Sequence, residues 1–407
     1  MAVGLLLYRS VLFSGDVLMT TDDNIGEIAQ RKSDMPYTFL WHWSDANLLG
    51  IAWQLTFNWT NLLMWILPVK AFTDSIHAVD LILGSIFFAL FLRQRAVSFW
   101  GQLLGGLAAF WVGSNFTLTY AGHIGKFAIL MLAPVSLLCI EKMVRTKRLE
   151  WSLLAGGSLG AMFLEQLDVA LFFSFLLGAY LLYAVWRDHG FGLKSVLRMI
   201  LPALVLAGVV AFRPLWEGYR TIIGSETTRL AESNRNNWDF ITQWSWPPEE
   251  SIDFVAPGYT GWRSGEPEGP YWGRMGRSAE WEKTKKGFQN FKLENQYIGA
   301  IPVMFAFFAL LVTWSKRRVT DEPLPGNRRW RADVYFWSAA TLLSLLLSFG
   351  KFFPLYYLFY HLPVVSSIRN PNKFLQIFQL ALAVLTAFGV SFACSKKPDV
   401  GPVSQNG

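Results

Sequence analysis

The chain has 407 residues, of which 53% are hydrophobic and only 16% are charged, and its formal net charge is +7. A soluble chain of this length usually carries about a quarter charged residues, so the composition excludes an ordinary soluble globular protein. Apolar runs long enough to cross a bilayer recur throughout. They predict an all-α, polytopic transmembrane helical bundle.

Ten apolar segments are expected to span the membrane. In chain order they are residues 2–14, 76–92, 97–113, 126–140, 151–164, 169–186, 197–213, 297–314, 333–349 and 374–394. The first is short and contains Arg9, which suggests that the chain starts inside a longer helix. A cleavable signal peptide is the competing interpretation, but no small-residue cleavage site follows this segment.

Lysine and arginine are concentrated in alternate connecting loops. They occur at 93–95, 142–148, 187–198, 316–331 and 396–397, whereas the short loops near 114–125 and 165–168 are free of them. Cytoplasmic loops carry an excess of these residues, so both termini are predicted to be cytoplasmic. These loops also account for the net charge, which gives no reason to expect nucleic acid as a partner.

The predicted spans divide the chain into three parts. Residues 1–213 form an N-terminal membrane module whose first outer loop covers 15–75. Residues 214–296 form a large, aromatic-rich extracytoplasmic loop, and residues 297–407 form C-terminal membrane helices and a short cytoplasmic tail. The apolar stretches 59–72 and 352–365 are too short to span and are expected to be interfacial or re-entrant helices. Cys139 and Cys394 imply no disulfide or metal site.

Four polar clusters lie at the predicted outward ends of the helices. Ionisable residues are costly near a membrane and often mark functional sites. The clusters supply the acidic pair Asp22 and Asp23, the residues His123 and Lys126, the supporting acids Glu165 and Asp168, and the cations Arg369 and Lys373.

Each cluster also has a structural explanation. Acidic residues after a first helix are often solvated loop residues, and Lys126 could simply extend to the membrane interface. Arg369 and Lys373 could be interfacial anchors. The segment before Glu165 has about fourteen residues, roughly 21 Å of helix, against a hydrocarbon core of about 30 Å. Glu165 and Asp168 are therefore expected in a recess below the outer surface, or in an interfacial turn.

Carboxylates and cations on one side of a membrane suit group transfer from a phosphate-linked donor. A carboxylate base activates an acceptor hydroxyl, and cations neutralise the leaving phosphate. Since nucleotide sugars are not available outside the cytoplasm, a lipid-phosphate sugar is the expected donor. The large loop adds aromatic residues that could stack on sugar rings, although such residues are common at membrane interfaces. These weaker candidates are Trp244, Trp246, Tyr259 and Trp262.

Four stretches of the chain resemble a known group of membrane proteins. They are the Asp22-Asp23 loop, Ala121–Phe127, Tyr297–Pro302 and Ile368–Phe374. Their order and sidedness resemble the GT-C superfamily of membrane glycosyltransferases and, within it, the bacterial YfhO-like family. The resemblance covers most of the chain. YfhO-like chains are typically much longer, so it implies a fragment or a compact relative.

The resemblance implies transfer of a sugar from a polyprenyl-phosphate donor to a glycan, lipid or protein acceptor on the outer face of a bacterial cytoplasmic membrane. It implies a catalytic base in the first outer loop, matched by Asp22 and Asp23, of which Asp22 is slightly preferred. It also implies donor-phosphate contacts, matched by His123, Lys126, Arg369 and Lys373. Some members of the superfamily use a divalent cation, so dependence on Mg or Mn is left open.

Two other function classes remain. A lipid or polysaccharide transporter, or flippase, would also use buried charge, and it predicts broken helices near the bilayer midplane and a pseudo-repeat. A catalytically silent scaffold in envelope assembly is the third interpretation. The property that separates them is whether the acidic and basic clusters converge on one cavity.

Overall fold

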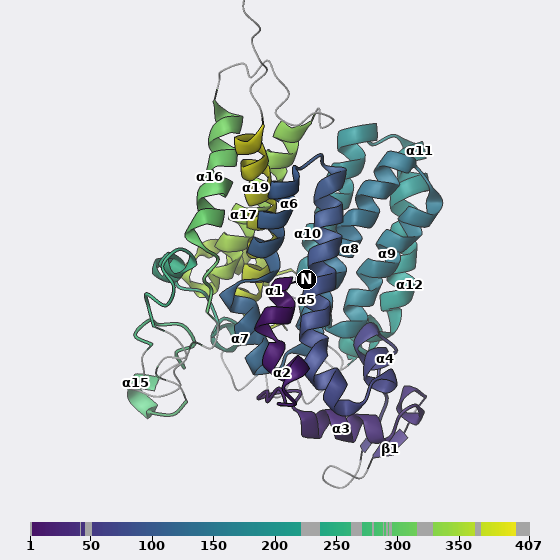
Figure 1. Cartoon of the computed structure of the whole chain (residues 1–407), viewed down its shortest axis with the longest axis vertical. Coiled ribbons are helices and arrows are strands. Elements are labelled where there is room, and N and C mark those ends of the chain that lie inside the picture. The colour runs from purple at the N-terminus through teal and green to yellow at the C-terminus, as the bar shows by residue number, and fades with distance from the viewer. Residues whose placement is uncertain are drawn as a thin grey trace, which may run out of the picture.

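The computed structural model describes most of the chain, in ranges that are separated by short gaps. These are residues 2–40, 42–44, 51–220, 237–261, 271–278, 281–287, 289, 292, 295–315, 329–362 and 368–395. Long helices run side by side along the longest axis of the molecule (Figure 1). Two short strands, β1 (His42–Ser44) and β2 (Ile51–Trp53), pair antiparallel with His42 opposite Trp53.

The helices follow one another in chain order through the bundle (Figure 1). In the N-terminal part they are α1 (Ala2–Leu7), α2 (Arg9–Phe13), α3 (Ile25–Ser33), α4 (Trp59–Ile66), α5 (Val69–Gln94), α6 (Phe99–Phe110), α7 (Gly113–Ala121), α8 (Ile124–Thr146), α9 (Leu149–Glu165) and α10 (Leu167–His189). The others are α11 (Leu193–Ser195), a π-helical turn η2 (Val196–Ile200), α12 (Leu201–Gly218), α14 (Asn237–Ile241), α15 (Trp281–Thr284), α16 (Ala300–Trp314), α17 (Trp330–Ser348), α18 (Pro354–Tyr360) and α19 (Phe374–Cys394).

Five helical segments among the described residues are long and apolar enough to cross a membrane. They are Val69–Gln94, Ile124–Thr146, Leu167–His189, Leu193–Gly218 and Pro371–Cys394. The prediction of a helical membrane protein is confirmed at this level. The other five predicted segments correspond to shorter or less apolar helices, so the count of ten spans stays a prediction.

The predicted span 97–113 and the predicted loop 114–125 differ from the structure. The helix breaks at Trp111 and Val112, and most of the expected loop is the helix α7. The break is stable because side chains satisfy the freed carbonyls. Asn115 Nδ2 donates to the Phe110 carbonyl at 2.9 Å, and Gln379 Nε2 donates to the Ala109 carbonyl at 2.7 Å.

The two stretches predicted as interfacial helices, 59–72 and 352–365, are each divided into shorter elements in the structure. Residues 59–72 form α4 and the first turn of α5, separated by Pro68, whose ring cannot continue the first helix. Residues 354–360 form α18, and 363–367 lie outside the described residues. The first predicted span is two short helices interrupted at Tyr8, and α1 begins near mid-height of the bundle (Figure 1).

The two ends of the bundle differ in their loops. One end carries α3, α4 and the two strands and is called the α3/α4 end; the opposite end carries α11 and is called the α11 end (Figure 1). The described basic loops after α5, α8 and α10 lie at the α11 end. At the α3/α4 end, Lys32 Nζ of α3 donates to the Met64 and Trp65 carbonyls at 2.7 and 2.6 Å, which caps α4.

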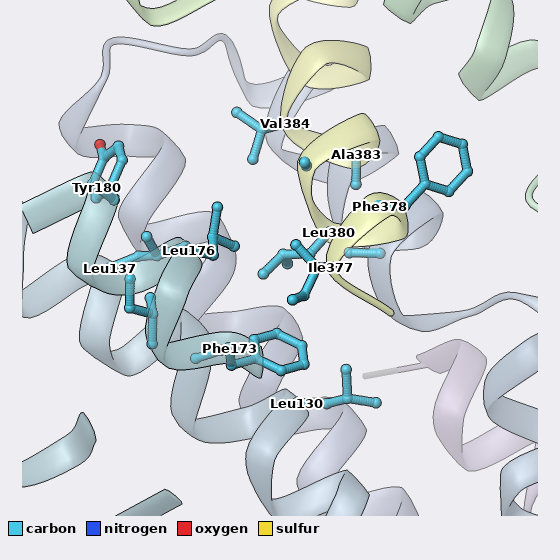
Figure 2. Close-up of a cluster of buried hydrophobic side chains, with 14 of the residues drawn as sticks. Leu130, Leu137, Phe173, Leu176, Tyr180, Ile377, Phe378, Leu380, Ala383 and Val384 are labelled. Carbon is cyan, nitrogen blue, oxygen red and sulfur yellow. The ribbon is translucent and has the colours of Figure 1, made fainter. Parts of the chain in front are cut away.

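The helix α19 is buried along nearly its whole length. Figure 2 shows Phe173 and Leu176 of α10 beside Ile377 and Leu380 of α19. Glycines also let neighbouring helices approach closely, which is common between membrane helices. A Cβ at Gly389 of α19 would overlap the Phe305 carbonyl of α16. This helix therefore joins the C-terminal helices to the N-terminal part.

A buried charge network lies toward the α11 end. Glu141 of α8 accepts from Arg95 at 3.2 Å and from Arg187 of α10 at 3.0 Å. Asp333 of α17 accepts from Arg95 Nε and Arg187 Nη1, both at 3.0 Å. Tyr180 donates to Glu141 at 2.5 Å. The charges are balanced, and the network connects four elements that lie far apart in the sequence.

Candidate active site

A polar pocket of about 330 Å³ lies at the α3/α4 end. The first outer loop, α3 and α4 supply much of its lining, and the start of α8 and the end of α9 supply the rest. Its polar lining residues include Asp23, Arg31, Asn58, Thr60, Asn61 and Glu165. Hydroxyl, amide and charged groups thus face one space large enough for a small polar ligand.

The acidic pair is held in place by the end of α7. The Asp22 N–H donates to the Ala121 carbonyl at 2.9 Å, and the Thr21 N–H donates to the Tyr120 carbonyl at 3.2 Å. Gly122 follows in the left-handed conformation, with φ of +83°. A Cβ at Gly122 would overlap the Asp22 carbonyl oxygen. A glycine is therefore required for the loop to dock here.

The two aspartates have different surroundings. Asp23 pairs with Arg31 of α3 at 2.7 Å, and both residues line the polar pocket. The Asp22 side chain is 66% exposed, and its Oδ2 lies 3.8 Å from His123 Nδ1. That distance is too long for a hydrogen bond. Asp22 is therefore an accessible carboxylate at the edge of the site, whereas Asp23 is held in an ion pair.

His123 is neutral at pH 7. Burial, reinforced by the neighbouring Lys126 ammonium, lowers the pKa of the His123 imidazole to about 4. The nearby Asp22 and Asp23 carboxylates oppose this shift but do not overcome it. The contact between Asp22 and His123 is therefore not an ion pair at neutral pH. A neutral imidazole beside a carboxylate could orient it or exchange a proton with it.

Glu165 forms part of the pocket wall. Its Oε1 accepts from the Thr60 N–H at 3.2 Å, and Asn58 Nδ2 donates to the Leu164 carbonyl at 2.9 Å. Asn58 also caps α4, because its Oδ1 accepts from the Asn61 N–H at 2.8 Å. The start of α4 is thus attached to the end of α9. The other supporting acid, Asp168, lies apart from this wall and forms an ion pair with Lys373.

Several predicted phosphate-binding residues gather beside the polar pocket. His123 lies within electrostatic range of Lys126 and Lys373, and Lys126 lies within range of Asp168. Lys126 is buried, 8% exposed, one residue after Gly125 of the pocket lining. The Arg369 guanidinium lies over the ring of Phe240 at 4.2 Å. The acidic and basic candidates are therefore adjacent, but of these residues only Asp23 and Glu165 line the pocket.

The aromatic candidates of the large loop have different environments. Trp246 is fully buried, stacked on Phe254 at 5.6 Å with Lys292 above its ring, so it is not available to a ligand. Trp244 is half-buried in the core. Tyr259 is exposed and meets the exposed Trp272 edge to face at 5.6 Å. Trp262 lies outside the described residues.

Sequence reasoning missed Arg31 and the amides of the pocket. Arg31 reaches Asp23 from within α3, eight residues further along the chain, and its charge alone did not mark it as a site residue. Asn58 could have been found, since asparagine before the apolar stretch at Trp59 is a helix N-cap signal. Among the described residues, no three histidine, cysteine or acidic side chains come together to hold a metal ion.

Comparison of the chain with models of known families, with curated proteins and with solved structures gave no match.

Proposed function

We propose that this protein is a membrane glycosyltransferase. It would move a sugar from a polyprenyl-phosphate donor to a cell-envelope acceptor on the extracytoplasmic face. The observation that carries the proposal is the polar pocket, with Asp23 and Glu165 in its wall, the exposed Asp22 at its edge and a basic cluster beside it. The resemblance of the sequence to the YfhO-like family points in the same direction.

Asp22 is the proposed base. It would take the proton from an acceptor hydroxyl as that oxygen forms a bond to the anomeric carbon of the sugar. The bond from that carbon to the donor phosphate breaks at the same time, and the phosphate leaves with the electron pair. The Asp23–Arg31 pair and Glu165 would hold sugar hydroxyls, because carboxylates, guanidinium groups and amides pair well with them.

The donor phosphate is assigned to the basic cluster. Lys126 and Lys373 would stabilise its negative charge, and the neutral His123 would donate a hydrogen bond. An apolar cavity of about 210 Å³ between α10, α17 and α19 includes Phe374, the residue after Lys373. It could accommodate part of an isoprenoid chain. Two carboxylates in the pocket wall leave Mg or Mn dependence open.

The proposed orientation has the α3/α4 end outside a bacterial cytoplasmic membrane. The support is the position of the described basic loops at the α11 end, since such loops are usually cytoplasmic.

A transporter of lipid or polysaccharide is the second candidate. The observation that favours it is the break between α6 and α7, since discontinuous helices are common in transporters. A transporter would move a labelled lipid-linked sugar across the bilayer without cleaving its phosphate bond, whereas a transferase would cleave it.

The test is sugar transfer in membranes that contain the full chain and a labelled polyprenyl-phosphate hexose. Asp22→Asn is expected to reduce transfer at least about 10²-fold at equal abundance, because it removes the base. Asp16→Asn is the matched control, since Asp16 lies in the same loop and, within the described part of the chain, its carboxylate accepts a hydrogen bond from Ser14 alone. Asp23→Asn and Glu165→Gln should weaken donor binding more than the rate.

Other outcomes decide between the assignments. A collapse of transfer in Asp23→Asn or Glu165→Gln, with Asp22→Asn fully active, would move the base to that residue. Movement of intact donor across vesicles containing the parent protein, without cleavage, would replace the transferase proposal with the transporter.

A further inference from the structure

Three ionisable residues follow one face of α5. Asp74, His77 and Asp80 recur every three residues, so each is a neighbour of the next on the helix surface. All three are buried, with exposures of 4%, 1% and 1%. The helix is one of those able to cross a membrane, where ionisable side chains are costly and commonly functional.

Asp74 has the partners that a buried carboxylate needs. Lys70 Nζ lies 2.6 Å from its Oδ2, and the Leu18 N–H donates to its Oδ1 at 2.8 Å. Asp74 therefore helps to fasten the first outer loop to α5 and is explained as a structural ion pair.

Asp80 has no such explanation. Its Oδ1 accepts from the Trp59 indole N–H at 2.9 Å, and its Oδ2 has no hydrogen-bond partner among the described residues. Glu165 of the pocket wall lies within electrostatic range and, when ionised, has a charge of the same sign. Asp80 is buried and Glu165 is half-buried, and among the described residues neither forms an ion pair with a cation, so the two carboxylates cannot both ionise cheaply. Asp80 is therefore expected to carry a proton.

His77 lies one turn before Asp80 on the same helix. Its two ring nitrogens have no partner among the described residues, and its edge packs against the ring of Phe127 at 4.7 Å. The titratable group that faces it from the α7–α8 turn is His123. A buried imidazole with both nitrogens unpartnered can accept a proton on one nitrogen and donate from the other.

We propose that Asp80 and Glu165 share one proton and, with His77, form a proton-binding site inside the bundle, beside the polar pocket. When one carboxylate ionises, the other keeps the proton. A ligand that binds the ionised Glu165 from the pocket therefore strengthens proton binding at Asp80. The groups that face the site are Glu165 from α9, Trp59 from α4 and His123 from the α7–α8 turn. The proposal does not depend on glycosyl transfer.

Infrared difference spectroscopy of the purified full chain tests this directly, by following the C=O stretching band of protonated carboxyl groups during a pH titration. The parent protein should show such a band at neutral pH, and Asp80→Asn should remove the component that persists to the highest pH, leaving the contribution of Glu165. In Glu165→Gln the Asp80 band should persist only to a lower pH, because the like charge is gone. Asp74→Asn is the matched control on the same helix face and should leave the band unchanged.

Stability provides a second readout. Asparagine resembles a protonated aspartate, so Asp80→Asn should unfold near the parent temperature, whereas Asp74→Asn loses an ion pair and should unfold earlier. The proposal is overturned if the parent shows no such band at neutral pH, or if the band in Asp80→Asn has the same size and the same pH dependence as in the parent. A band that titrates identically in Glu165→Gln and the parent overturns the sharing of a proton. If a variant does not accumulate, the titration of the parent protein still tests whether a carboxyl group is protonated at neutral pH.

Discussion

At the scale of single residues, Gly122 decides whether the candidate base reaches the site. The loop that carries Asp22 bonds to the last carbonyls of α7, and this close approach leaves no room for a side chain at Gly122. The left-handed backbone there is also unfavourable for other residues. One residue without a side chain thus brings the first outer loop and the start of α8 together.

Gly122→Ala should release this loop. We expect the variant to lose sugar transfer and about 1–3 kcal/mol of stability, because both the backbone strain and the steric overlap oppose docking. Gly106→Ala is the control, since Gly106 is a buried helical glycine with no atom near its Cβ position. It should be neutral or slightly stabilising. Thermal unfolding, and proteolysis of the loop, measure both. An intact, docked loop in Gly122→Ala would contradict this explanation.

At the scale of elements, the buried charge network toward the α11 end holds helices together. Glu141 and Asp333 alternate with Arg95 and Arg187, so each charge has partners of opposite sign. Such a network adds little over a well-packed apolar core, but removing one member leaves a buried charge unbalanced. It therefore specifies how α5, α8, α10 and α17 align.

Glu141→Gln is expected to cost about 3–5 kcal/mol of stability, because two buried guanidinium groups lose a counter-charge. Glu150→Gln is the matched control, since Glu150 forms an exposed pair with Arg148. Such pairs contribute less than about 1 kcal/mol. Denaturant unfolding in detergent compares the two. Equal losses of stability would show that the network does not hold these helices.

At the scale of the whole molecule, α19 is the helix around which the C-terminal elements assemble. Gly101 and Gly105 of α6 pack against Ala387 on one side, and Gly389 faces the Phe305 carbonyl of α16 on another. Close backbone approach supplies the contact that the hydrophobic effect does not supply between helices in lipid. Even one added methyl group should therefore be felt across the bundle.

Gly389→Ala should separate α16 from α19 and lower the unfolding temperature, at a cost of about 1–3 kcal/mol from overpacking. Gly178→Ala on α10 is the control, because no atom lies near its Cβ position. Unfolding of the two purified variants is compared with that of the parent. If Gly389→Ala unfolds at the same temperature as the parent protein, α16 and α19 are not close enough at this position to exclude a methyl group.

The sequence alone predicted the class of fold and most helix positions, because hydrophobicity along a segment is a local property. The helices α8, α10, α12 and α19 all contain most of their predicted spans. It did not show the break at Trp111, because the carbonyls freed there are satisfied by Asn115 and the distant Gln379. A local pattern contains no information about a partner that lies far along the chain.

The site divides in the same way. The sequence placed Asp22, Asp23 and Glu165 among the functional candidates from charge and position alone, whereas the tertiary structure brought Asp23 and Glu165 into one pocket with Arg31. Asp80 lies within the predicted span 76–92. An ionisable side chain is energetically costly there and commonly marks a functional residue, so the sequence already contained this signal. Only the structure showed that Asp74 pairs with a cation and that Asp80, among the described residues, does not. Whether a buried charge is balanced depends on the groups that folding brings to it.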